Sequence, residues 1–100
     1  MTVDEFMHHV ASHDTPPSDM AQPLQALWQA AKGNWDAAHA LAQQMKSLTG
    51  SWIHGHLHRE EGDLDNAGFW YRHAGKPMPT ESVQAERKAL IHHFLRDDIH

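Results

Sequence analysis

Three histidines stand at alternate positions in the segment SWIHGHLHREEGD, which covers residues 51–63. On an α-helix, the spacing i, i+4, i+7 places His54, His58 and Glu61 on one face. Two imidazoles and a carboxylate are side chains of the kind that hold zinc and other divalent transition metals. A neighbouring antiparallel helix would bring His39 to the same face. A metal site at these four residues is therefore one interpretation of the spacing.

Composition and charge exclude several classes of protein. One hundred residues make one small domain, expected to cover 1–100, and the lack of cysteine excludes disulfides, thiolate metal sites and cysteine nucleophiles. The formal charge is −5 and the eight Lys and Arg are scattered, so the basic stripe of a nucleic-acid binder is missing. No apolar run approaches the ~18 residues that cross a bilayer, and the start MTVDEFMHHV lacks the apolar core of a signal peptide. We expect a cytoplasmic protein that binds neither nucleic acid nor membrane.

The eleven histidines are an unusual number for this length. Protonating all of them would change the formal charge from −5 to +6, near the ordinary histidine pKa of about 6.5. This property suggests an interaction module that responds to pH. Motifs of known catalytic chemistry, such as a P-loop, GxGxxG or GxSxG, are missing, so no catalytic residue is predicted and enzymatic activity stays open.

Apolar residues recur at helical spacing along the chain, and no segment alternates with period two, so the chain is predicted to be all-α. Thr2 and Glu5 have the spacing of a capping box. Thr49-Gly50-Ser51 is expected to interrupt the helices, and Asn34 and Thr80 are expected to cap two of them. The predicted helices, about six in number, include one at 2–13, one from about Trp52 to Glu61 and one at 80–97.

Two of the predicted turns match each other. Residues 32–38 (KGNWDAA) align with residues 61–67 (EGDLDNA). In each turn a glycine ends one helix, an Asn or Asp caps the next, and a later alanine allows the helices to approach closely. A repeated helix–turn–helix unit indicates a short helical solenoid. Its units would cover 22–48 and 50–79, with the helices at 2–13 and 80–97 as caps.

The second unit resembles a tetratricopeptide repeat. The match rests on the small helix-A residue, the turn glycine, the small and aromatic residues of helix B and the closing proline, which are Gly55, Gly62, Ala67, Tyr71, Ala74 and Pro79. The first unit fits at Ala26, Gly33 and Ala38, but lacks the expected aromatic residue. The stretch LHREEGDLDNAGFWYRHAG also resembles a group of small uncharacterised helical proteins of bacteria, which implies no activity.

The resemblance implies a scaffold or adaptor, without a cofactor, that binds a protein or peptide. In tetratricopeptide proteins, helix-A residues one turn apart line the concave groove, and Trp52, His56 and Arg59 map there. An exposed tryptophan supplies contact area and a guanidinium binds carboxylates. The alternative, which is slightly favoured, is that Trp52 packs in the core against the preceding helix. Phe69 lies off the apolar face of its helix and is a further binding candidate, although packing on the last helix is the expected fate of so large an aromatic. Since two repeats leave apolar faces to cover, the terminal helices or a second copy in a homodimer would cover them.

The same resemblance gives the histidines a structural role. His54 and His58 take positions that pack helix A on helix B, where half-buried imidazoles would hydrogen-bond to neighbours such as Asn66 or Glu61. The HExxH pattern of zinc peptidases is absent, because Gly55 follows His54. The sequence therefore favours packing, with metal binding as the alternative.

Overall fold

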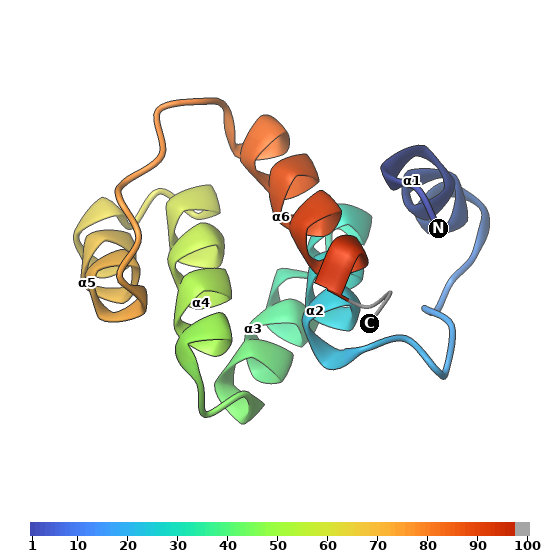
Figure 1. The fold of residues 1–100 in the computed structure, drawn as a ribbon, viewed down its shortest axis with the longest axis horizontal. Helices are drawn as coiled ribbons and strands as arrows, with labels where there is room; N and C mark the ends of the chain where they lie inside the picture. Colours follow the sequence, from blue (N-terminus) through green and yellow to red (C-terminus); the bar gives the residue numbers. More distant parts are fainter. Residues whose placement is uncertain (98–100) are drawn as a thin grey trace.

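A computed structural model describes residues 1–97 of the chain as six α-helices joined by short loops, with no strand in that range (Figure 1). The all-α prediction is confirmed. No helix within these residues is long and apolar enough to cross a membrane. The helices are α1 (Val3–Ser12), α2 (Gln22–Lys32), α3 (Trp35–Gln44), α4 (Leu48–Glu60), α5 (Leu64–Ala74) and α6 (Val83–Asp97).

Two helical hairpins, α2 with α3 and α4 with α5, make up much of the fold (Figure 1). Gly33 and Gly62 form their turns at φ values of 94° and 86°, in the left-handed region that glycine adopts without a Cβ clash. These are the two turns that repeat in the sequence. Inside the second hairpin, a Cβ at Gly55 would lie 3.1 Å from the ring of Tyr71. This glycine therefore sets how closely α4 and α5 approach.

Helix α6 returns across α2 and α4, and α1 packs against α2 and α6 (Figure 1). The apolar faces of these helices form one core, in which the following side chains have no exposed surface: Phe6, Leu27, Trp28, Ile53, Leu57 and Ile91. Burial of these side chains is the main stabilising contribution to the fold. The path of α6 also decides which face of α4 stays accessible.

The predicted interruption at residues 49–51 is wrong, because α4 already begins at Leu48. Gly50 lies in the first turn of the helix and packs against the end of α3. A Cβ at this position would lie 2.1 Å from the carbonyl oxygen of Met45. The glycine thus allows a close approach of two backbones and does not break the helix.

The capping residues are only partly as predicted. The Thr2–Glu5 capping box is present, with reciprocal hydrogen bonds of 2.8 and 3.1 Å. Asn34 stands at the N-cap position of α3 as predicted, but its side chain makes no capping hydrogen bond there. At α6, the hydroxyl of Ser82, and not that of Thr80, accepts a hydrogen bond from the backbone of helix residue 85 at 3.0 Å.

Candidate metal centre

Three imidazoles from two helices meet beside the α4–α5 hairpin. His39 extends from α3, and His54 and His58 extend from α4, one turn apart. One ligand nitrogen of each ring lies within 4.8 Å of the other two. His54 and His58 are 6% and 7% exposed, and His39 is half-buried. A tetrahedral ion with Zn–N distances of ~2.1 Å separates its nitrogens by about 3.4 Å, so inward movement of at most about 1.4 Å at any pair would complete the geometry.

Hydrogen bonds fix the tautomers of His54 and His58. Nδ1 of His54 lies 3.2 Å from the carbonyl oxygen of Gly50, and Nδ1 of His58 lies 2.7 Å from the carboxylate of Glu61. A carbonyl and a carboxylate only accept, so each Nδ1 donates its hydrogen. In a neutral ring, Nε2 then keeps the lone pair that binds a metal. Proteins orient metal-binding histidines through outer hydrogen bonds of this kind.

Two tryptophans stack on the histidine cluster. The Trp35 ring lies on His39 with centroids 4.8 Å apart and planes inclined by 11°. The Trp70 ring lies on His54 at 4.3 Å and 15°. Trp35 is itself held by a 2.8 Å hydrogen bond from its indole N–H to the carbonyl of Leu57. The indoles therefore fix the orientation of two imidazoles and cover part of their surface.

Burial keeps two of the imidazoles neutral. It lowers the pKa of His54, with a further decrease from the nearby His39 ring and a smaller opposing effect of the Gly50 carbonyl. Burial also lowers the pKa of His39, and the His58 ring adds to this effect. Neutral imidazole is the form that binds metal ions, so these two side chains need not lose a proton first near pH 7.

Glu61 is not a member of the three-histidine cluster, but it contacts one of its histidines. Its carboxylate contacts Nδ1 of His58, the nitrogen that does not carry the free lone pair. Within a three-histidine site it would therefore orient His58 instead of serving as the direct ligand that the sequence pattern predicts. Glu61 and Asp63 are exposed, and with His58 they form a second group whose ligand atoms lie within 4.8 Å of one another. Asp63 also caps α5 by accepting the backbone N–H of Asn66 at 3.3 Å.

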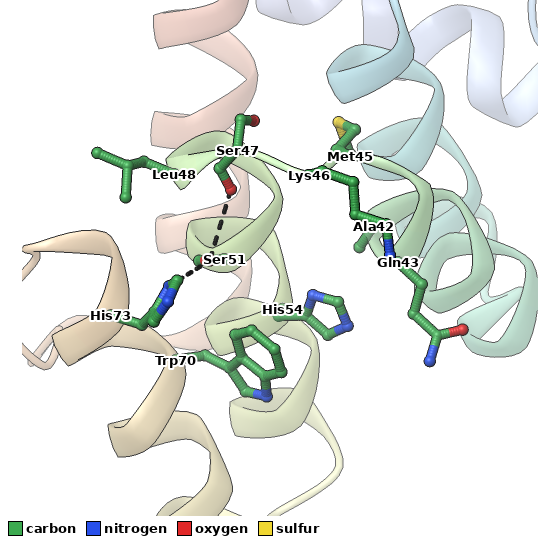
Figure 2. Close-up of a pocket in the computed structure, with 10 residues that line it drawn as sticks. All are labelled: Ala42, Gln43, Met45, Lys46, Ser47, Leu48, Ser51, His54, Trp70 and His73. Carbon is green, nitrogen blue, oxygen red and sulfur yellow. Dashed lines mark hydrogen bonds between the residues drawn. The ribbon is translucent and has the colours of Figure 1, made fainter.

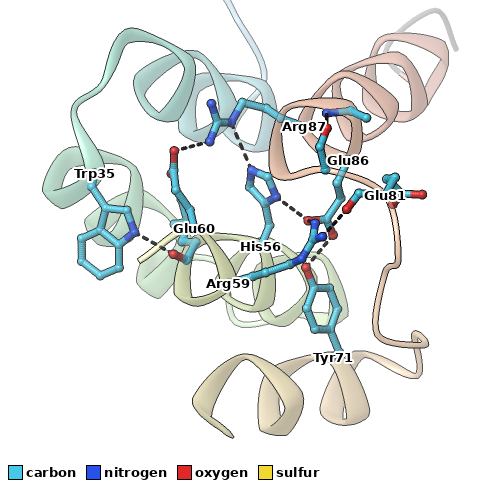
Figure 3. Close-up of polar contacts among 11 residues, drawn as sticks. Trp35, His56, Arg59, Glu60, Tyr71, Glu81, Glu86 and Arg87 are labelled. Atoms are coloured by element: carbon cyan, nitrogen blue, oxygen red, sulfur yellow. Dashed lines mark hydrogen bonds and ion pairs between the residues drawn. The ribbon is translucent and has the colours of Figure 1, made fainter. Parts of the chain in front are cut away.

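The predicted binding residues on α4 do not form one exposed surface. His56 is completely buried, and its Nδ1 lies 2.7 Å from the carboxylate of Glu86 on α6 (Figure 3). Arg59 reaches the same carboxylate at 3.2 Å. Trp52 is half-buried and meets Phe94 edge to face at 5.7 Å. Helix α6 thus lies over the part of α4 that the tetratricopeptide resemblance assigns to a partner.

Glu86 is the centre of this buried network. The hydroxyl of Tyr71 donates to it at 2.5 Å, and Nε of Arg87 donates to Nε2 of His56 at 3.1 Å, which leaves the hydrogen of His56 on Nδ1, facing Glu86 (Figure 3). Burial alone would raise the pKa of Glu86, but the hydrogen bonds from His56, Tyr71 and Arg59 outweigh it and lower the pKa. Burial and the same contact raise the pKa of Tyr71 well above its ordinary value. The network joins α4, α5 and α6.

The predicted packing of Phe69 on the last helix is wrong. Phe69 is 51% exposed, and its ring meets Trp70 edge to face at 5.2 Å. Helix α6 packs on α1, α2 and α4, so it does not cover the outer face of α5. Phe69 therefore forms an exposed aromatic surface next to the tryptophan that stacks on His54.

A cavity of about 580 Å³ opens next to His54, between the end of α3, the start of α4 and the side of α5 (Figure 2). The hydroxyl of Ser51 and Nδ1 of His73 lie 2.8 Å apart in its wall. The sequence pattern predicted neither this cavity nor that Trp70 would line it. The residues that line it are Ala42, Gln43, Met45, Lys46, Ser47, Leu48, Ser51, His54, Trp70 and His73.

Comparisons of the chain with protein-family models, with curated protein sequences and with solved structures found no match. The feature with the most specific chemistry is the meeting of His39, His54 and His58.

Proposed function

We propose that this chain is a metal-binding protein that holds one zinc ion, or another divalent transition-metal ion, through His39, His54 and His58. The observation that carries the proposal is the approach of three ring nitrogens to within 4.8 Å, with Nδ1 of His54 and of His58 already engaged in hydrogen bonds. Nitrogens that share so small a region can bind one cation that lies between them.

The ligand set favours a transition metal over calcium or magnesium. Imidazole suits zinc, copper, nickel and iron, whereas calcium and magnesium require oxygen ligands. The chain has no cysteine, so thiolate ligands are excluded. The carboxylate of Glu61, bonded to His58, would offset part of the charge that three neutral ligands leave on the ion.

Calorimetric titration of tag-free protein with zinc tests the proposal. We expect one ion per chain, bound by the wild type and lost in the His54→Ala/His58→Ala variant. The matched control is His8→Ala/His92→Ala, which removes two exposed histidines and should bind like the wild type. Circular dichroism confirms that each variant is folded. Weak binding at several sites, equal in both double variants, would contradict the proposal.

A tetratricopeptide-like scaffold that binds a protein or peptide is the second candidate. Support comes from the two hairpins, each turning at a left-handed glycine, and from Phe69, which exposes half of its side chain beside Trp70. This proposal moves the partner surface from the region around His56 to the outer face of α5. Phe69→Ala should then abolish capture of a partner, whereas Leu64→Ala, an exposed residue at the start of α5, should not. Equal capture by both variants would contradict it.

A further inference from the structure

The cavity beside α4 shares a wall with the proposed metal centre. His54 belongs to both, and Trp70, which stacks on His54, also lines the cavity. Figure 2 shows the two rings side by side at one end of the cavity, away from Leu48 at the start of α4. A molecule in the cavity would therefore contact the ring of a metal ligand.

Three histidines would leave a coordination position open. Zinc bound by three protein side chains usually completes a tetrahedron with water or a substrate, as in catalytic sites. In the described part of the chain, no fourth His, Asp or Glu joins the group of His39, His54 and His58. The fourth position would therefore be available to an external ligand.

The charge of the cavity wall favours an anion. The whole chain contains thirteen Asp and Glu and carries a formal charge of −5. Nevertheless, the described residues that line this cavity include Lys46 and no acidic residue. A bound divalent ion would add to this positive potential.

The size and lining of the cavity suit a small organic molecule. Its volume of about 580 Å³ lies within the usual range of ligand sites. Met45, Leu48 and Trp70 supply apolar surface, while Ser51 and His73 supply polar atoms. A phosphate group is usually bound by several Arg and Lys side chains or by a glycine-rich loop. A single ammonium group with one open metal position fits a carboxylate better.

We propose that this cavity binds a small organic carboxylate, an inference that rests on the metal-binding function proposed above. One carboxylate oxygen takes the open position on the ion, and the Lys46 ammonium group balances the remaining charge. The apolar body of the molecule lies against Met45 and Trp70.

Cobalt-loaded, tag-free protein tests this proposal, because the visible spectrum of Co²⁺ responds to a change of its ligands. The probe is benzoate, and the control probe is benzamide, which has the same shape without the charge. We expect benzoate to change the spectrum with saturation and benzamide to leave it nearly unchanged. Lys46→Glu should weaken benzoate binding at least about tenfold. Lys88→Glu, which makes the same charge change at an exposed position of α6 outside the cavity, should not weaken it.

The outcomes separate the two proposals. If cobalt binds at one ion per chain and benzoate leaves the spectrum unchanged, the carboxylate site is wrong and the metal site stands. Equal responses to benzoate and benzamide, or equal affinities of the Lys46→Glu and Lys88→Glu variants for benzoate, would also overturn the carboxylate site. If cobalt does not bind, or binds equally well without His54 and His58, the metal-binding function fails, and the carboxylate site fails with it.

Discussion

Replacing Glu86 by glutamine tests the buried network that joins α4, α5 and α6. The Glu86 residue is 5% exposed and its carboxylate accepts hydrogen bonds from His56, Tyr71 and Arg59 at 2.7, 2.5 and 3.2 Å. The amide keeps one acceptor oxygen but turns an NH₂ group toward these donors and leaves the Arg59 charge unpaired. Removing one partner of a buried ion pair costs about 3–5 kcal/mol, and we expect about 3 kcal/mol for this conservative change.

A loss of that size is easily measured in a domain of this length. It is a large part of the ~5–15 kcal/mol by which small domains are stable, and it corresponds to a decrease in Tm of at least about 12 °C. Urea unfolding followed by tryptophan fluorescence gives the free energy of unfolding. Glu81→Gln, at an exposed position just before α6, is the control and should change it by less than about 0.5 kcal/mol. If Glu86→Gln is as stable as the control, the network does not stabilise the fold as argued.

The same variant has a defined pH dependence. The hydrogen bonds to Glu86 outweigh its burial, so its pKa is lower in the folded chain than in the unfolded chain. Such a group stabilises the fold above the unfolded pKa of about 4.3, and the contribution disappears as the pH falls through the lower folded value. The difference in stability between the wild type and Glu86→Gln should therefore persist at pH 5 and shrink below about pH 4. A difference that grows in acid would contradict the assignment.

Three further predictions concern the metal centre and the second hairpin. Glu61→Gln should keep one zinc ion per chain but weaken its binding about 10–100-fold, as measured by chelator competition. The reason is that the neutral amide is a weaker hydrogen-bond partner for Nδ1 of His58 than the carboxylate is. Free zinc at 100 times its Kd should raise the free energy of unfolding by about 2.7 kcal/mol in the wild type, and should have no effect in the His54→Ala/His58→Ala variant. Gly55→Ala should destabilise the fold by about 1–3 kcal/mol in urea unfolding, since its Cβ would lie 3.1 Å from the Tyr71 ring. Gly68→Ala should be tolerated, because its nearest atom is the flexible end of Arg72.

Local periodicity predicted the parts of the fold that depend on neighbouring residues. Helical spacing placed His54 and His58 on one face of α4, with Glu61 at its C-terminal end, and the turn between α3 and α4 brought His39 to that face. Trp35 could also have been predicted as a stacking partner of His39, because the two are four residues apart on one helix.

Other features depend on contacts between distant parts of the chain. The burial of His56 follows from the path of α6, which brings Glu86 to it from thirty residues further along the chain. The path of α6 also explains why Phe69 is exposed, because α6 packs on α1, α2 and α4 and does not cover the outer face of α5. Gly50 suggested a break because glycine both ends helices and permits close contacts, and only the position of the Met45 carbonyl distinguishes the two roles. A short sequence pattern contains none of this information.

X-ray absorption spectroscopy of the zinc-loaded, tag-free protein tests the metal centre most directly, because it reports the ligands of the ion itself. We expect one zinc per chain with three imidazole nitrogens at about 2.0–2.1 Å and one further light ligand. The imidazole contribution should fall when His54 and His58 are replaced by alanine and stay the same when the exposed His8 and His92 are replaced. A spectrum dominated by oxygen ligands, or one that is equal in the two double variants, would contradict the three-histidine site.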